Sequence, residues 1–76
     1  MDQNFIDNMN KKILFEMGEA LSHLEMAIKQ LSTTAEHYYE INDNCNGNIR
    51  DNASNTLVYE MEKLQFLNTQ LKSLLK

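Results

Sequence analysis

The chain has no proline among its 76 residues, and this absence constrains its fold more than any other feature. Proline ends or kinks a helix because it lacks an amide hydrogen and clashes with the preceding turn, so helices in this chain can run long. No stretch shows the alternation of apolar and polar residues, rich in β-branched side chains, that marks a strand. The sequence therefore predicts an all-α fold.

Apolar residues follow helical spacing over about residues 4–43. Steps of four and three residues form a heptad seam, made of Ile13, Met17, Ala20, Leu24, Ala27, Leu31, Thr34, Tyr38 and Ile41. A neighbouring line widens this seam into a stripe suited to globular packing, and consists of Leu14, Leu21, Ile28 and Ala35. We expect one helix here, with Asp2 or Asn4 as its N-cap. A break is possible at Gly18 or in the weak run that starts at Ser32.

The asparagine-rich segment 42–48 predicts the connection between two helices. Asparagine tolerates left-handed backbone, and Asn46 followed by Gly47 is a strong turn signal. We expect a turn over 44–48, Asn48 as the next N-cap, and a second helix over about 49–75. Its stripe is Ala53, Leu57, Leu64, Leu67, Leu71 and Leu74, flanked by Met61 and Leu75. The prediction is a long antiparallel helical hairpin that forms a single domain over 1–76.

The two predicted helices differ in length, and this difference leaves apolar surface without cover. Folding about Asn46 brings Lys76 only to about Glu16, and exposed apolar segments of such a size mark interaction surfaces. The candidate partner or dimer surface is Phe5, Ile6, Met9, Ile13, Leu14, Phe15, Val58, Tyr59 and Phe66. A core this small is marginal, and the single cysteine, Cys45, excludes an internal disulfide. We therefore expect a homodimer that completes a four-helix bundle.

Residues that could carry chemistry are few and badly spaced. The segment from Asn42 matches part of an EF-hand loop, but Asn42 and Ala53 stand where the first and last carboxylates are required. His23, His37 and Cys45 lack the spacing of a metal cluster, and Cys45 has no oriented base beside it. We expect no enzymatic activity, no metal and no cofactor.

The charge pattern narrows the possible partners. The net charge is −4 and the seven Lys and Arg residues are scattered except for Lys11 and Lys12, so direct nucleic-acid binding is not expected. An RNA-binding helical bundle is a third alternative, which lacks the basic stripe that such binding needs. There is no apolar run of about 18 residues and no secretory signal pattern, so we expect a cytoplasmic protein without a membrane partner.

These features favour a small non-catalytic protein–protein interaction module, such as a regulator, adaptor or co-chaperone, that acts through apolar helix faces. The alternative is an acidic inhibitor, encoded by a phage or mobile element, that blocks a nucleic-acid-binding or defence protein. Its acidic helix faces would consist of Glu16, Glu19, Glu25, Glu36, Glu40, Glu60 and Glu62.

Overall fold

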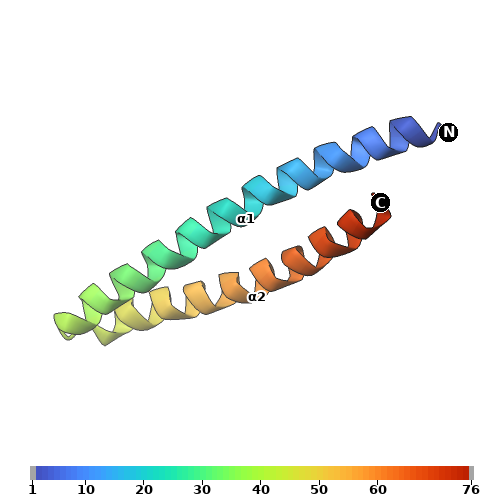
Figure 1. The fold of residues 1–76 in the computed structure, drawn as a ribbon. Helices are drawn as coiled ribbons and strands as arrows, with labels where there is room; N and C mark the ends of the chain where they lie inside the picture. The colour runs from blue at the N-terminus through green and yellow to red at the C-terminus, as the bar shows by residue number, and fades with distance from the viewer. Residues whose placement is uncertain (1, 76) are drawn as a thin grey trace.

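Two long helices make up the structure, a computed structural model that describes residues 2–75. Helix α1 (Gln3–Glu40) has 38 residues and helix α2 (Asn44–Leu74) has 31. They run antiparallel, side by side, in a rod of 60 × 16 × 15 Å (Figure 1). No strand occurs within residues 2–75. The predicted all-α antiparallel hairpin is confirmed.

Helix α1 is continuous through Gly18 and through the run that starts at Ser32, so neither position breaks it. Asp2 is its N-cap, and the Asp2 carboxylate accepts a hydrogen bond of 3.3 Å from the amide of Asn4. The hydroxyls of Thr33 and Thr34 donate to the carbonyls of Lys29 and Gln30, at 2.9 and 2.8 Å. The threonine hydroxyls thus bond within the helix instead of redirecting the chain.

The turn occupies residues 41–43, so the predicted turn at 44–48 is wrong. Asn42 has a left-handed backbone with φ of 62°. Its amide donates to the carbonyl of Tyr39 (3.0 Å), and the amide of Asp43 donates to the carbonyl of Tyr38 (2.8 Å). These two bonds form a Schellman motif, which satisfies carbonyls left free at the end of α1.

Helix α2 consequently begins at Asn44, and its N-cap is Asp43 where Asn48 was predicted. The Asp43 carboxylate accepts from the backbone amide of Asn46 (3.1 Å) and from its side-chain amide (2.7 Å). This cap directs the following residues into a helix, and Gly47 has no positive φ. The sequence Asn46-Gly47 is therefore part of a helix and not a turn.

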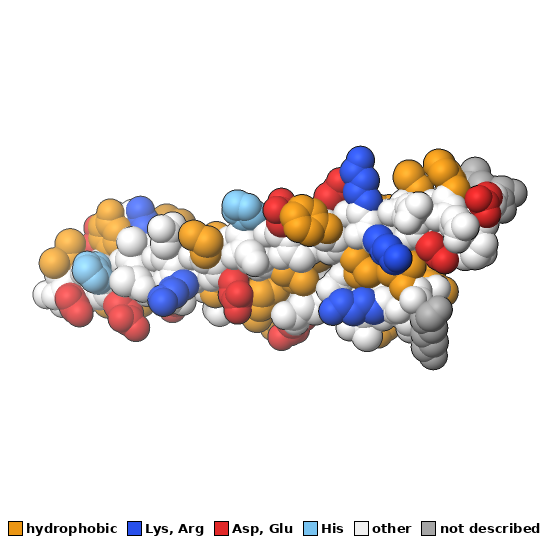
Figure 2. Space-filling view, turned by 45° about the horizontal axis from the view of Figure 1, so that its top comes forward, with side chains coloured by type: hydrophobic (Ala, Val, Ile, Leu, Met, Phe, Trp, Pro, Cys, Tyr) orange, Lys and Arg blue, Asp and Glu red, His pale blue; other side chains and the backbone are white. Residues whose placement is uncertain are grey.

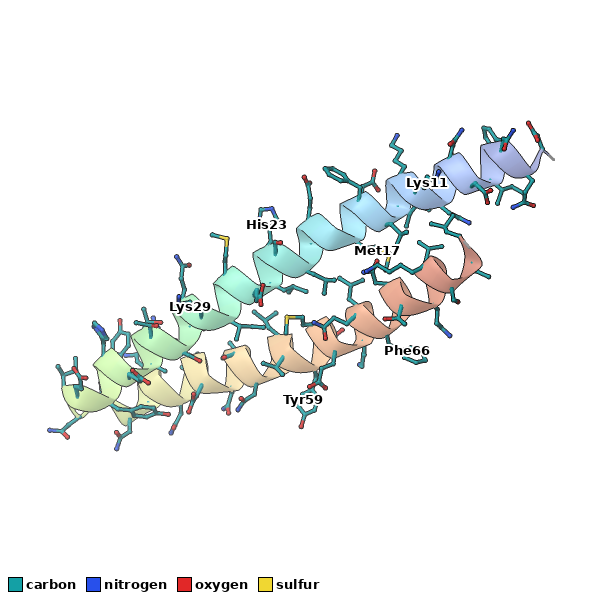
Figure 3. All side chains as sticks on the ribbon, in the orientation of Figure 1. Lys11, Met17, His23, Lys29, Tyr59 and Phe66 are labelled. Atoms are coloured by element: carbon teal, nitrogen blue, oxygen red, sulfur yellow. The ribbon has the colours of Figure 1, made fainter. Side chains whose placement is uncertain are left out.

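The helices pack along a seam to which each helix contributes two lines of residues. Within a line, successive residues are seven apart in the sequence. In α1 the seam consists of Leu14, Met17, Leu21, Leu24, Ile28, Leu31, Ala35 and Tyr38. In α2 it consists of Gly47, Arg50, Ser54, Leu57, Met61, Leu64, Asn68, Leu71 and, just past the helix end, Leu75. These residues are buried or half-buried, and Figure 3 shows Met17 directed between the two helices.

About half of the residues predicted for the seam therefore lie beside it, at the neighbouring heptad position. Met17, Leu24, Leu31 and Tyr38 lie in the seam as predicted, but the residues predicted to alternate with them, except half-buried Ala27, are exposed: Ile13, Ala20, Thr34 and Ile41. In α2, Leu67 and Leu74 are likewise exposed. Small residues decide the choice, because the Ser54 hydroxyl lies 3.2 Å from that of Ser32 and 3.5 Å from the carbonyl oxygen of Ile28.

The earlier turn also changes how far α2 extends along α1. Contacts between Ser32 and Ser54 and between Tyr39 and Gly47 set a register in which α2 reaches to about Lys11, beyond the predicted limit at Glu16. Figure 1 shows the N-terminal part of α1 extending past the end of α2. The overhang is shorter than predicted and contains Phe5, Ile6 and Met9.

Candidate interaction surface

The interior of the hairpin is only partly closed. Among the apolar residues of the described chain, Ala35 alone is buried, with 1% of its surface exposed. The leucines of the seam are half-buried, and no large side chain within residues 2–75 is fully buried. A fully buried core residue normally contacts neighbours on all sides, so one hairpin leaves its own core partly open to water.

The closed end of the hairpin is the most tightly arranged region. The Tyr39 ring lies against the backbone of Gly47, and its hydroxyl donates to Asn48 Oδ1 (2.8 Å) and to Asp51 Oδ2 (3.3 Å). The Arg50 guanidinium lies over the Tyr38 ring, 4.3 Å from its centroid, within range of a cation–π interaction.

Two pKa values at this end are shifted by their surroundings. Desolvation, and then the charge and hydrogen bond of Asp51, raise the pKa of the Tyr39 hydroxyl above its usual 10.0. Hydrogen bonds from Asn46, with a smaller contribution from the charge of Arg50, lower the pKa of Asp43 below its usual 3.8. Both shifts favour the protonation states that exist at neutral pH.

The contact between Tyr39 and Asp51 identifies one flank of the hairpin. Tyr39 and Asp51 each lie four residues after a seam residue of their own helix. The residues that share their heptad positions therefore lie on the same side of the seam. This polar flank also carries Lys11, Gly18, Glu25 and Ser32 from α1 and Val58, Gln65 and Lys72 from α2. Its side chains are mostly exposed and polar.

On the opposite side of the seam, the neighbouring heptad positions of α1 and α2 form a second flank, and this flank is apolar. We define the apolar flank as Ile6, Ile13, Ala20, Ala27, Thr34 and Ile41 of the first line, with Ala53, Glu60, Leu67 and Leu74 of the second. Large side chains are open to water there: the exposed fraction is 41% for Ile13, 53% for Leu67 and 70% for Leu74. Ile6, Ala27 and Ala53 of this flank are half-buried, and its other residues are exposed.

The surface of the apolar flank is hollowed near the turn. One shallow hollow is lined by Ala27, Leu31 and Thr34, together with Lys29, Gln30 and Thr33. A second hollow continues toward the turn and is lined by Thr34, His37, Tyr38, Glu40 and Ile41. The first hollow lies over the small residues Ala27 and Thr34, and Thr34 also lines the second.

The nine candidate residues from the sequence do not form one surface. Ile6 and Ile13 lie on the apolar flank, with Met9 beside them, whereas Leu14 belongs to the seam and Val58 to the polar flank. Phe5 and Phe15 are exposed on the outer side of α1, and Figure 3 shows Tyr59 and Phe66 pointing away from α1 on the outer side of α2. Sequence reasoning missed Ile41, Leu67 and Leu74 as surface residues because it assigned them to the seam.

The acidic residues are dispersed as well. The seven glutamates named above are all exposed, and they occupy several different lines around the two helices. On the face in Figure 2, acidic, basic and hydrophobic side chains are interspersed along the rod. The ion pair between Lys63 Nζ and Glu60 Oε1 (3.4 Å) is the one found within residues 2–75. No surface of a single charge sign results.

Side chains that could bind a metal or react lie apart from one another. Within residues 2–75, no three His, Cys, Asp or Glu side chains converge as a metal ion would require. Cys45 is a free, exposed thiol near the turn. The segment that partly matches an EF-hand loop is helical from Asn44 onward, so its side chains do not wrap around a common point.

Comparisons with protein-family models, with curated proteins and with solved structures each gave no match to this chain. Neither helix, in the residues described, is long and apolar enough to cross a membrane.

Proposed function

We propose that this chain is a non-catalytic protein–protein interaction module whose first partner is a second copy of itself. Two hairpins would together form a four-helix bundle, and the module would then act as a regulator or adaptor toward another protein. The observation that supports this proposal is the exposed apolar flank beside a seam that is itself only half-buried.

The width of the apolar stripe supports a bundle of four helices over an isolated pair. In each helix the stripe is three lines wide: two lines form the seam, and the third forms the apolar flank. A helix in a pair has one neighbour, which covers two lines. A helix in a four-helix bundle has two neighbours, and its apolar stripe faces the central axis between them. A second hairpin would cover the third line.

A bundle formed in this way leaves other apolar side chains on its outside. Phe15, Tyr59 and Phe66 are each about two-thirds exposed and point away from the seam. Aromatic residues are enriched at the centres of protein interfaces, so these three are candidates for contact with a further protein. The free thiol of Cys45 fits the reducing conditions of a cytoplasmic location.

Sedimentation velocity over a range of micromolar concentrations tests the self-association. We expect a dimer whose helicity falls as it dissociates on dilution. Leu67→Lys should weaken the dimer, whereas Gln65→Lys, a matched change on the polar flank of α2, should leave it intact. A monomer at every concentration, with full helicity and a concentration-independent melt, would refute the dimer.

Affinity capture from the source cell tests the second partner. A protein retained by the wild-type chain should be lost with the double variant Tyr59→Ser and Phe66→Ser. It should be kept with Asn52→Ser and Ser73→Ala, changes to exposed polar residues on the same outer line. Equal retention by both double variants would exclude the outer aromatic residues as the contact.

A further inference from the structure

The apolar flank is not uniform along its length. Its half near the open end carries large side chains, namely Ile6, Ile13, Leu67 and Leu74. Its half near the turn carries mainly small ones, Ala27, Thr34 and Ala53, with one large exposed residue, Ile41, next to the turn, and it contains the two hollows. Apart from Ile41, the half near the open end therefore projects where the half near the turn is recessed.

We infer that two copies pack apolar flank against apolar flank with their turns at opposite ends of the bundle. In this arrangement α1 lies antiparallel to α1 of the second copy, and α2 to its counterpart. This inference rests on the proposed self-association and adds the face, the direction and the pairing of residues.

The pairing in α1 follows from a two-fold axis at mid-length, between Ala20 and Ala27. Ala20 then lies opposite Ala27 of the other copy, Ile13 lies opposite Thr34, and Ile6 lies opposite Ile41. The two alanines allow the α1 helices to approach closely at the axis. Away from the axis, Ile13 of each copy fills the hollow beside Thr34 in the other.

The pairing in α2 follows the same rule. Leu74 of one copy lies opposite the small Ala53 of the other, and Leu67 lies opposite Glu60. Glu60 is paired with Lys63 of its own chain, with 3.4 Å between charged atoms, so its carboxylate has a partner while its stem packs beside leucine. In α2, as at Ile13 and Thr34 of α1, large side chains meet small or flexible ones, whereas Ile6 and Ile41 at the two ends of α1 bring two large side chains together.

The opposite arrangement, with both turns at one end, packs less well. It places α1 of one copy against α2 of the other at the same height along the rod. Ile13 would then meet Leu74, whereas Thr34 would meet Ala53. Large residues would be crowded at one end and a void left at the other, and both effects are destabilising.

The size of the flank is sufficient for a stable dimer. The side of the hairpin that contains the flank is 60 Å long and about 15 Å wide, the extents of the whole rod, and so offers roughly 900 Å² per copy, while a standard protein interface buries about 800 Å² per partner. A second copy can therefore cover the whole length of the flank.

Distances between spin labels on the native chain test the direction directly. Cys45 is a free, exposed thiol near the turn and is the natural labelling site. With the turns at opposite ends, the two labels should lie close to the 60 Å length of the hairpin apart. With the turns together, they should lie below about 40 Å, the width of a bundle whose helices are each 10–12 Å across.

A second label separates the direction from the existence of the dimer. In a variant with Cys45→Ser and Ser22→Cys, the label sits at mid-length, on an exposed position outside the apolar flank. Any two-fold dimer of full overlap gives a distance below about 40 Å there. A long distance at Cys45 with a short one at residue 22 supports the inference. Short distances at both sites overturn the direction and leave the proposed module standing. No dipolar signal at residue 22 overturns the dimer and with it the inference.

A charge placed at the axis tests the pairing. Ala20→Glu should raise the dimer dissociation constant at least about a hundredfold, because it buries an unpaired carboxylate. Ser22→Glu, a matched change outside the flank, should not alter the constant. Since residue 20 lies outside the seam, both variants should keep the helicity of the hairpin at high concentration. An unchanged constant in Ala20→Glu would overturn the inference.

Discussion

The Tyr39 ring occupies the space that a side chain at Gly47 would need. A Cβ atom at position 47 would lie 2.5 Å from Cε1 of Tyr39 and 2.7 Å from its Cδ1. Carbon atoms do not approach so closely without a shift of one of them. The glycine is therefore required by the close approach of α1 and α2 beside the turn.

The two glycines should respond in opposite directions to the same substitution. Gly18→Ala should raise the free energy of unfolding by about 0.5–1 kcal/mol, because Gly18 lies inside a helix with open space around it. Gly47→Ala should lower it, since overpacking costs about 1–3 kcal/mol. In a Tyr39→Ala background, Gly47→Ala should become stabilising. Urea denaturation at fixed protein concentration measures all four variants, and equal effects at both glycines would contradict the contact.

Replacing the left-handed residue of the turn by glycine or by alanine should change the stability of the hairpin differently. Asn42 has φ of 62°, a conformation that costs an ordinary L-residue about 1–2 kcal/mol. Asn42→Ala should destabilise the hairpin by roughly 1 kcal/mol, whereas Asn42→Gly should be neutral or slightly stabilising. Thermal melts of the two variants give the comparison, and the prediction fails if alanine is as well tolerated as glycine.

Acid should weaken the hairpin through Asp43. Because its folded pKa is lowered, Asp43 contributes stability above its unfolded value, near 3.8, and this contribution is lost as the pH falls through the folded pKa. Asp43→Asn should remove this dependence. Its amide oxygen can still accept the capping bond but does not titrate in this range.

Alkali should weaken the same end through Tyr39. The pKa of Tyr39 is raised in the folded state, so its contribution is complete below about 10 and is lost as the pH rises through the folded pKa. Tyr39→Phe should flatten this alkaline dependence. Denaturation midpoints measured from pH 2 to 11, on wild type and both variants, test the two ends of the range together.

Asn68 should be replaceable at a gain in stability. Its Oδ1 atom is buried in the seam without a hydrogen-bond partner, and such an atom costs about 1–3 kcal/mol. Asn68→Leu should raise the free energy of unfolding, because it removes the unsatisfied group and adds apolar contact. A lower stability in this variant would show that the amide has a partner in the assembled protein. Thr69→Leu, an exposed neighbour, is the control.

Carboxylates added to the turn region should not create a calcium site. The residues after Asp43 are helical, so the double variant Asn42→Asp and Ala53→Glu places its new carboxylates on a helical path that cannot surround one ion. Isothermal titration with Ca²⁺ should show no binding in the micromolar range. Binding by the variant would show that this segment can unwind into a loop.

The sequence by itself determined the helices and the hairpin. The chain has no proline, and its apolar residues recur at steps of three and four on both sides of one asparagine-rich segment. Both of these stretches therefore favour a helix. The position of the turn was missed by a few residues. Asn46-Gly47 has the composition of a turn, and only contact with Tyr39 shows that the glycine is needed for packing within a helix.

Only the tertiary structure decided which lines of the apolar stripe face each other. Met17, Leu24 and Leu31 fit either of two seams, because a heptad pattern reads equally well with the line of Leu14 or with that of Ile13 beside it. Packing of two helices selects one line through close approach, here at Ser54 and Gly47. This selection leaves Ile13, Leu67 and Leu74 exposed on one flank. Periodicity gives the width of an apolar stripe, but the direction in which its partner lies depends on contacts between residues far apart in the chain.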